Sequence, residues 1–191
     1  GGITGVEDIQ EEWSEDGNDW NRNDEPLNEE GYATDLIADE AIKVVENHDT
    51  SDPLFLYVAF TAPHSPLQVP EPYLDMYKAE DMTVPQGPLE APIYSIGGMK
   101  REELQRRRAI YASMVTCMDD SIGRIMDSLR EQGMDENTIL FFCSDNGGCP
   151  DLGALNDPLR GSKTSVYEGG VRVPAFMHCP EQIDAATVVD A

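Results

Sequence analysis

Apolar residues recur at helical spacing in two stretches of the chain. In residues 34–47 they stand three or four positions apart, and a longer stripe runs through residues 100–132. The longer stripe consists of Leu104, Tyr111, Met114, Val115, Met118, Ile122, Ile125 and Leu129. The spacing predicts a first helix over 34–47 and a second, long helix over 100–132, which ends at Gly133.

Two short and nearly continuous apolar runs are typical of buried strands. They cover residues 54–60 and residues 138–143, and the first reads as a strand buried on both faces. Residues 61–98 are rich in proline and glycine, which predicts loop with a short helix near 73–77. A further apolar segment covers residues 173–179. The alternation of helices and strands predicts an α/β fold with a largely parallel sheet.

Charge restricts the class of partner. Lys and Arg number 13 against 37 Asp and Glu, so the formal net charge is −24, which argues against a nucleic-acid partner. No apolar run is long enough to span a bilayer, and residues 1–4 show no signal peptide. Acidic side chains crowd residues 1–30, and a solvated loop explains them better than calcium capture. We therefore divide the chain into an acidic, loop-rich segment, 1–30, and a globular part, 31–191.

The four cysteines do not predict a zinc site, because none of them forms a Cys-x-x-Cys pair. Cys117 lies on the long helical stripe and Cys143 lies in the second apolar run, so we expect both to be small buried core residues. Cys149 and Cys179 are free to pair with each other or with other segments. The cysteines therefore do not indicate whether the protein works in an oxidising or a reducing compartment.

The strongest chemical feature follows the second predicted strand. Asp145 and Asn146 stand just after residues 138–143 and are followed by two glycines, and ligands of open α/β sheets bind at such strand ends. Carboxylate and amide oxygens suit calcium or magnesium. Lys163, on the glycine-rich loop that follows, is placed to reach an anion bound to that metal. These residues predict a metal-assisted site for an anionic group.

His64 is the second chemical feature, because it follows the first predicted strand and lies between Pro63 and Pro66. A histidine in that place can donate a hydrogen bond to an anion or protonate a leaving oxygen near neutral pH. It is equally consistent with a turn residue held by two prolines. Spacing alone leaves both interpretations open.

Other polar residues favour structural interpretations. His48 fits a cation at the C-terminus of the first helix, and His178 fits a hydrogen-bonded structural residue in an apolar run. Asp119 and Asp120 are adjacent on a helix, so their side chains diverge by about 100° and do not converge on one ion. The basic residues 106–108 fit the polar side of the same helix.

Four segments together resemble the type I sulfatases. They are residues 54–70, 118–123, 144–148 and 158–174, and the resemblance extends over about residues 30–180. It is closest to the arylsulfatase B-like branch, which acts on N-acetylgalactosamine 4-sulfate. The resemblance implies an alkaline-phosphatase-like α/β sandwich, of which this chain would hold an incomplete part.

The resemblance also implies a chemistry. The chain would belong to a sulfuric ester hydrolase that cleaves sulfated glycans or aryl sulfate esters with the help of Ca²⁺. Asp145 and Asn146 match calcium ligands, Lys163 matches the lysine that contacts the sulfate, and His64 matches the histidine near the leaving-group oxygen. Members of the family are commonly secreted, periplasmic or lysosomal, so an extracytoplasmic location is expected. The oligomeric state is not indicated.

The chain also departs from the family pattern. The family's nucleophile is a formylglycine made within a Cys-x-Pro-x-Arg motif, and no cysteine or serine here stands in such a motif. We expect the formylglycine, an aspartate pair and a Lys-x-His segment upstream of this chain, which alone would be inactive. Two alternatives stay open: a phosphomonoester or phosphonate hydrolase of the alkaline-phosphatase-like group, and a non-catalytic glycan-binding paralogue.

Overall fold

The computed structural model describes residues 4–5, 20–23, 25–27, 29–84 and 99–188. Most of the acidic segment 1–30 therefore lies outside the described residues, and the division at residue 30 stays a prediction. The helices are α1 (Ala33–Glu46), α2 (Glu71–Leu74), α3 (Arg101–Glu131) and α4 (Glu168–Val171), with 3₁₀ turns η2 (Ala79–Asp81), η3 (Asp135–Asn137) and η4 (Pro150–Leu152). The strands are β1 (Thr4–Gly5), β2 (Asn21–Arg22), β3 (Glu25–Pro26), β4 (Gln68–Val69), β5 (Leu140–Cys143) and β6 (Ala175–His178).

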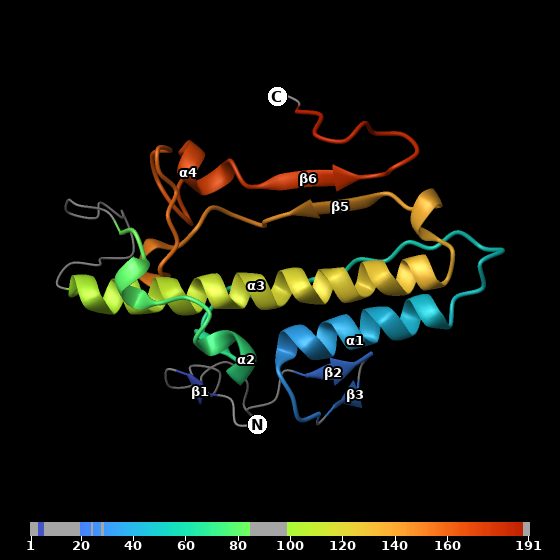
Figure 1. The fold of residues 1–191 in the computed structure, drawn as a ribbon, viewed down its shortest axis with the longest axis horizontal. Helices are drawn as coiled ribbons and strands as arrows, with labels where there is room; N and C mark the ends of the chain where they lie inside the picture. Colours follow the sequence, from blue (N-terminus) through green and yellow to red (C-terminus); the bar gives the residue numbers. More distant parts are fainter. Residues whose placement is uncertain (1–3, 6–19, 24, 28, 85–98, 189–191) are drawn as a thin grey trace.

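Two long helices form the body of the described part, and both were predicted. α1 lies along the C-terminal half of α3 (Figure 1). Their contact centres on Ala38, Ala41 and Ile125, which are at most 7% exposed, because small side chains on one helix let the other approach closely. Gly133 has a φ of +68°, a left-handed conformation that ends α3 where the sequence predicted.

The paired strands within the described residues are antiparallel, whereas the sequence predicted a largely parallel sheet. β5 and β6 form a two-stranded pair whose register runs from Leu140 opposite His178 to Cys143 opposite Ala175. The rings of Phe142 and Phe176 stack across this pair with centroids 4.8 Å apart. The other two pairs, β1 with β4 and β2 with β3, contain two residues per strand. Apolar runs indicate that strands exist, but they do not indicate which strands become neighbours.

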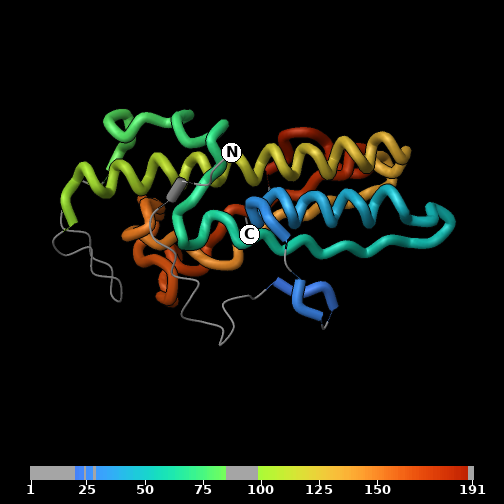
Figure 2. Tube along the Cα trace, turned by 90° about the horizontal axis from the view of Figure 1, so that it is seen from below, coloured from blue at the N-terminus to red at the C-terminus, as the bar shows by residue number. Residues whose placement is uncertain are grey.

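The first predicted strand, residues 54–60, is extended but is not assigned to any sheet. Figure 2 shows this segment running beside α1. Its side chains alternate between two environments. Leu56, Val58 and Phe60 pack against the contact between α1 and α3, whereas Phe55 and Tyr57 are 92% and 81% exposed. The prediction of burial on both faces was wrong, because no second layer within the described residues covers the outer face.

The same cause explains one other correction. Cys143 is exposed rather than buried, because β5 and β6 are covered only in part. His178 on β6 is exposed as well, and its structural role stays a prediction. Cys117 is fully buried, as predicted. All four cysteines are free, so of the two possibilities left open for Cys149 and Cys179, a bond between them is not formed.

A second core cluster fixes the loops that carry the candidate site residues. It contains Leu67 and Val69 beside β4, and Met114 and Cys117 on α3. Ala62 and Leu152 pack on its edge. Ala62 belongs to the loop that follows residues 54–60, and Leu152 belongs to the loop that follows β5. Both loops are therefore held against the same part of α3.

Candidate functional site

The segment that follows β5 forms a tight polar turn around Asp145 and Asn146. The Asn146 backbone N–H donates to Asp145 Oδ1 at 2.8 Å, and Asn146 Nδ2 donates to the Gly147 carbonyl at 3.0 Å. The Ser144 hydroxyl closes the turn by donating to the Asn146 carbonyl at 3.0 Å. Within the described residues, Asp145 Oδ2 and Asn146 Oδ1 accept no hydrogen bond. Two hard oxygen donors are thus available at the end of this strand.

Lys163 is held against this turn through its backbone. Its N–H donates to the Gly148 carbonyl at 3.1 Å, and the Gly147 N–H donates to the Gly170 carbonyl at 2.9 Å. The Gly169 N–H binds the Arg160 carbonyl at 2.7 Å. We call Gly147, Gly148, Gly169 and Gly170 the glycine junction. The structure therefore brings the predicted metal turn and the predicted lysine loop into direct contact.

The glycine junction requires residues without side chains. A Cβ on Gly147 would overlap the Gly169 carbonyl oxygen and lie 2.8 Å from Gly170 Cα. A Cβ on Gly170 would overlap the Ser165 carbonyl oxygen and come within 2.6 Å of the Ser162 carbonyl oxygen. These neighbours are backbone atoms and cannot turn aside. The repeated glycines are therefore explained by close approach of three chain segments.

His64 lies on an exposed loop and is fixed by its neighbours in sequence. Its backbone N–H donates to the Thr61 carbonyl at 2.9 Å, and its Nδ1 lies 3.0 Å from the Ser65 carbonyl oxygen. Within the described part of the chain, no hydrogen bond or ion pair links His64 to Asp145, Asn146 or Lys163. Its loop is related to the glycine junction only through the shared packing of Ala62 and Leu152 on the second core cluster.

The basic residues 106–108 include two anchors that the sequence did not reveal. Arg107 Nη1 donates to the Asp151 carbonyl at 2.9 Å, and Arg108 Nη1 donates to the Gly153 carbonyl at 2.8 Å. Both carbonyls belong to the loop around η4, which follows the Asp145 turn. A contact between an arginine and a distant carbonyl leaves no periodic pattern, so no signal in a single sequence identifies it. These residues do more than form the polar side of α3.

The prediction for Asp119 and Asp120 is confirmed, and His48 lies where the sequence predicted, while its charge stays a prediction. Asp119 and Asp120 are exposed, and Asp120 accepts a hydrogen bond from the Tyr73 hydroxyl at 3.0 Å. His48 follows the end of α1, where its backbone N–H binds the Val45 carbonyl at 3.3 Å.

Cys149 follows the Asp145 turn, and its thiol is chemically inert. Burial and a hydrogen bond from Sγ to the Asp151 carboxylate, 2.6 Å long, raise the pKa of this thiol to about 12. Burial likewise raises the pKa of the Cys117 thiol to about 11. Because the thiolate is the reactive form, neither group is a nucleophile near neutral pH.

The oxygen atoms available in the Asp145 turn are of the type that calcium binds. Asp145 and Asn146 offer carboxylate and amide oxygens, and calcium takes about six to eight oxygen ligands. Among the described residues, no group of three or more His, Cys, Asp or Glu side chains is arranged to hold a metal ion. The turn by itself offers two of the oxygen ligands that such an ion takes, and calcium binding stays a prediction.

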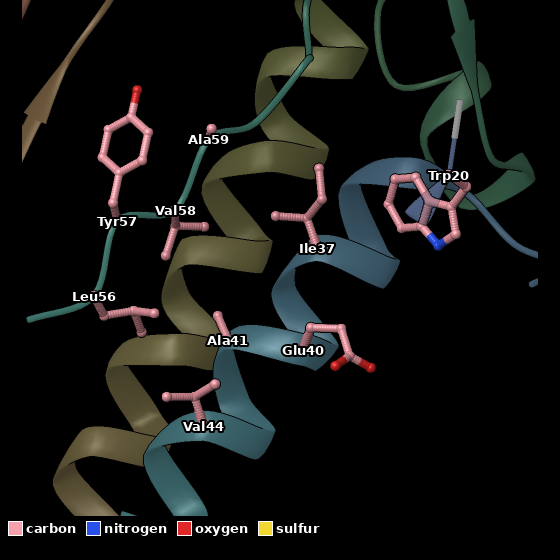
Figure 3. Close-up of a pocket in the computed structure, with 9 residues that line it drawn as sticks. All are labelled: Trp20, Ile37, Glu40, Ala41, Val44, Leu56, Tyr57, Val58 and Ala59. Atoms are coloured by element: carbon pink, nitrogen blue, oxygen red, sulfur yellow. The ribbon is translucent and has the colours of Figure 1, made fainter. Parts of the chain in front are cut away.

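A groove of about 280 Å³ lies elsewhere, between α1 and the extended residues 54–60. Figure 3 shows Leu56 and Val58 directed toward the helices and Tyr57 directed away from them. Most of its lining is apolar, and Glu40 is the only charged side chain among the lining residues. Glu40 is already paired with Arg22 and Lys43, each at 2.7 Å. The groove contains none of the predicted site residues, so the candidate site is the glycine junction.

The sequence and the fold both match a known protein family. The sequence profile of the Sulfatase family matches residues 3–191. The chain therefore belongs to the sulfatase family. The family match and the structural similarity described next confirm the predicted alkaline-phosphatase-like α/β class.

Individual relatives agree with this assignment. The chain is 37% identical over 157 residues to arylsulfatase J of Mus musculus, an alignment that covers 82% of this chain and 22% of the relative. It is 28% identical over 163 residues to N-acetylgalactosamine-6-sulfatase of Homo sapiens, covering 83% of this chain and 26% of the relative. It thus spans about a quarter of the length of these relatives. The arylsulfatase B-like branch stays a prediction.

A solved structure shows the same fold. The crystal structure of Ps i-CgsB in complex with k-i-k-neocarrahexaose matches this chain with a TM-score of 0.67 and 32% sequence identity. The match covers 85% of this chain and 31% of that one. Among the described residues, no helix is both long and apolar enough to cross a membrane.

Proposed function

We propose that the full natural protein containing this sequence hydrolyses sulfate esters, and that this chain supplies part of the site. The observation that carries the proposal is the backbone contact between Lys163 and Gly148, 3.1 Å long. This contact joins the loop that carries the half-buried Lys163 to the segment that follows the Asp145 turn, which supports a role for both in one site. Membership of the sulfatase family supports the same chemistry.

Each residue has a role in this proposal. Asp145 and Asn146 would hold Ca²⁺, which when bound neutralises negative charge on the sulfate. The Lys163 ammonium donates to sulfate oxygens and stabilises the charge that develops as the S–O bond breaks. No hydrogen bond or ion pair engages that ammonium within the described residues, so it is available to an anion. His64 donates a proton to the leaving oxygen.

Substrate, nucleophile and location belong to the same proposal. The substrate is a sulfated glycan or an aryl sulfate ester, in keeping with relatives that are named an arylsulfatase and an N-acetylgalactosamine-6-sulfatase. The nucleophile is a formylglycine outside these 191 residues, because no Cys-x-Pro-x-Arg motif occurs in them. The protein works outside the cytoplasm.

The experiment that tests this function compares a sulfate ester with a phosphate ester of the same phenol. The purified full natural protein is incubated with p-nitrophenyl sulfate and with p-nitrophenyl phosphate, with and without a calcium chelator. We expect sulfate release that falls at least tenfold with the chelator, because calcium holds and polarises the ester, and recovers when calcium is restored. Preferential release of phosphate would favour the phosphatase alternative. Failure to cleave either ester, or any sulfated glycan, would remove the proposed activity.

A further inference from the structure

Gly148 is the residue at which the Asp145 turn meets the Lys163 loop, and the side chain of Asn156 binds both of its backbone groups. The Gly148 N–H donates to Asn156 Oδ1 at 2.8 Å, and Asn156 Nδ2 donates to the Gly148 carbonyl at 3.0 Å. The same carbonyl accepts the Lys163 N–H at 3.1 Å. The primary amide of Asn156 thus pairs with both the N–H and the C=O of one residue, as a residue of a neighbouring strand would.

A short side chain that ends in a primary amide, as in asparagine, satisfies that arrangement. Its side chain offers a donor and an acceptor side by side, and the space around them is closed. A Cβ on Gly148 would lie 2.5 Å from Ala154 Cβ and 3.2 Å from Asn156 Oδ1. Ala154 is 3% exposed. The amide is therefore packed against the turn.

The loop that carries Asn156 is itself attached to the rigid α3 helix. Arg107 and Arg108 bind carbonyls of this loop, and a Cβ on Gly153 would lie 2.6 Å from Arg108 Cα. The Leu159 N–H also binds the Asn156 carbonyl at 2.8 Å. The amide thus links the helix α3 to the Asp145 turn and the Lys163 loop, the two segments that carry the predicted ligands.

From these contacts we propose that Asn156 is a positioning residue, which sets the place of Lys163 relative to Asp145 and Asn146. The proposal rests on the proposed function, and it deepens it by naming what aligns the two parts of the site. Without the amide donor, the Gly148 carbonyl retains only the Lys163 N–H, and Gly148 loses the contact that fixes it to the loop held on α3. A shift of about 1 Å in a reacting group is enough to slow an enzyme about 100-fold.

The test uses the full natural protein with Asn156→Asp, Asn156→Ala and, as a matched control, Asn47→Asp. Aspartate keeps the size and the acceptor of asparagine but loses the donor. Asn47 also donates through Nδ2 to a carbonyl, that of Lys43 at 2.7 Å, but it lies at the end of α1. We expect kcat for p-nitrophenyl sulfate to fall about 10–100-fold in both Asn156 variants and to stay within twofold of wild type in Asn47→Asp. The Lys163 backbone amide should exchange its hydrogen faster only in the Asn156 variants.

A double variant separates positioning from general damage. If Asn156 acts through Lys163, then Asn156→Asp should add less than threefold to the loss caused by Lys163→Ala, because interacting residues are not additive. Losses that multiply in the double variant, or an Asn156→Asp protein within twofold of the control, would overturn the proposal. If the wild-type protein cleaves no sulfate ester, the proposed function is wrong. Hydrogen exchange at the Lys163 backbone amide then tests the positioning role of Asn156 by itself. Unchanged exchange at Lys163 in Asn156→Asp then overturns the positioning role as well.

Discussion

Replacing Lys163 with alanine in the full natural protein is expected to lower kcat for a sulfate ester about 10²–10³-fold, the usual loss when one preorganised donor to a developing charge is removed. The protein should stay folded, because the fixed contact of Lys163 is made by its backbone N–H to the Gly148 carbonyl. Alanine retains that N–H. The loss should therefore come from the missing ammonium and not from a displaced loop.

The matched control for this variant is Lys43→Ala. Lys43 lies near the end of α1 and pairs with Glu40 at 2.7 Å on an exposed surface, where such pairs add little to stability. We expect unchanged turnover in Lys43→Ala and thermal midpoints close to wild type in both variants, measured by steady-state kinetics and calorimetry. Full turnover in Lys163→Ala would remove Lys163 from the mechanism. A large drop in its midpoint alone would assign it a structural role.

Adding one methyl group at Gly147 is expected to destabilise the protein by about 3 kcal/mol, at the upper end of the cost of overpacking. The new Cβ would overlap the Gly169 carbonyl oxygen and approach Gly170 Cα to 2.8 Å. Relief requires the backbone segments to separate, which breaks the hydrogen bond from Gly147 N–H to the Gly170 carbonyl, 2.9 Å long. Gly147→Ala should therefore lose stability and site geometry together.

Alanine at Gly123 should change the stability of the protein in the opposite direction. Gly123 lies inside α3, and a Cβ there meets nothing within 4 Å. Alanine in a helix interior is favoured over glycine by about 0.5–1 kcal/mol, so Gly123→Ala should stabilise the protein slightly. Denaturant unfolding of the two variants measures both effects. Equal stability of Gly147→Ala and Gly123→Ala would show that the glycine junction is not closely packed.

The sequence predicted local structure well where periodicity was long. The stripe through residues 100–132 covers many helical turns, so the prediction of α3 depended little on any one residue, and Gly133 marked its end. Burial was harder to predict. The apolar run at residues 54–60 indicates an extended segment, but Phe55 and Tyr57 are exposed because exposure depends on a second layer. Cys143 was misjudged for the same reason.

The candidate site was predicted in part. The strand end predicted the position of Asp145 and Asn146, and the glycine-rich loop predicted that Lys163 comes near them. The contacts of Arg107 and Arg108 could not be predicted, because each binds a backbone carbonyl far away in sequence. The contact of Asn156 with Gly148 is closer in sequence, but it lies in an irregular loop that has no periodic pattern. Such contacts depend on the folded path of the chain and leave no spacing to read. His64 stays a prediction, since only shared packing relates its loop to the junction.

The most direct test of the account is a crystal structure of the full natural protein with calcium and inorganic sulfate. The account predicts a calcium ion bound by oxygens of Asp145 and Asn146 at about 2.3–2.6 Å, with a sulfate oxygen within hydrogen-bonding distance of Lys163 Nζ. A calcium ion bound elsewhere, with Asp145 and Asn146 unliganded and Lys163 facing solvent, would contradict it.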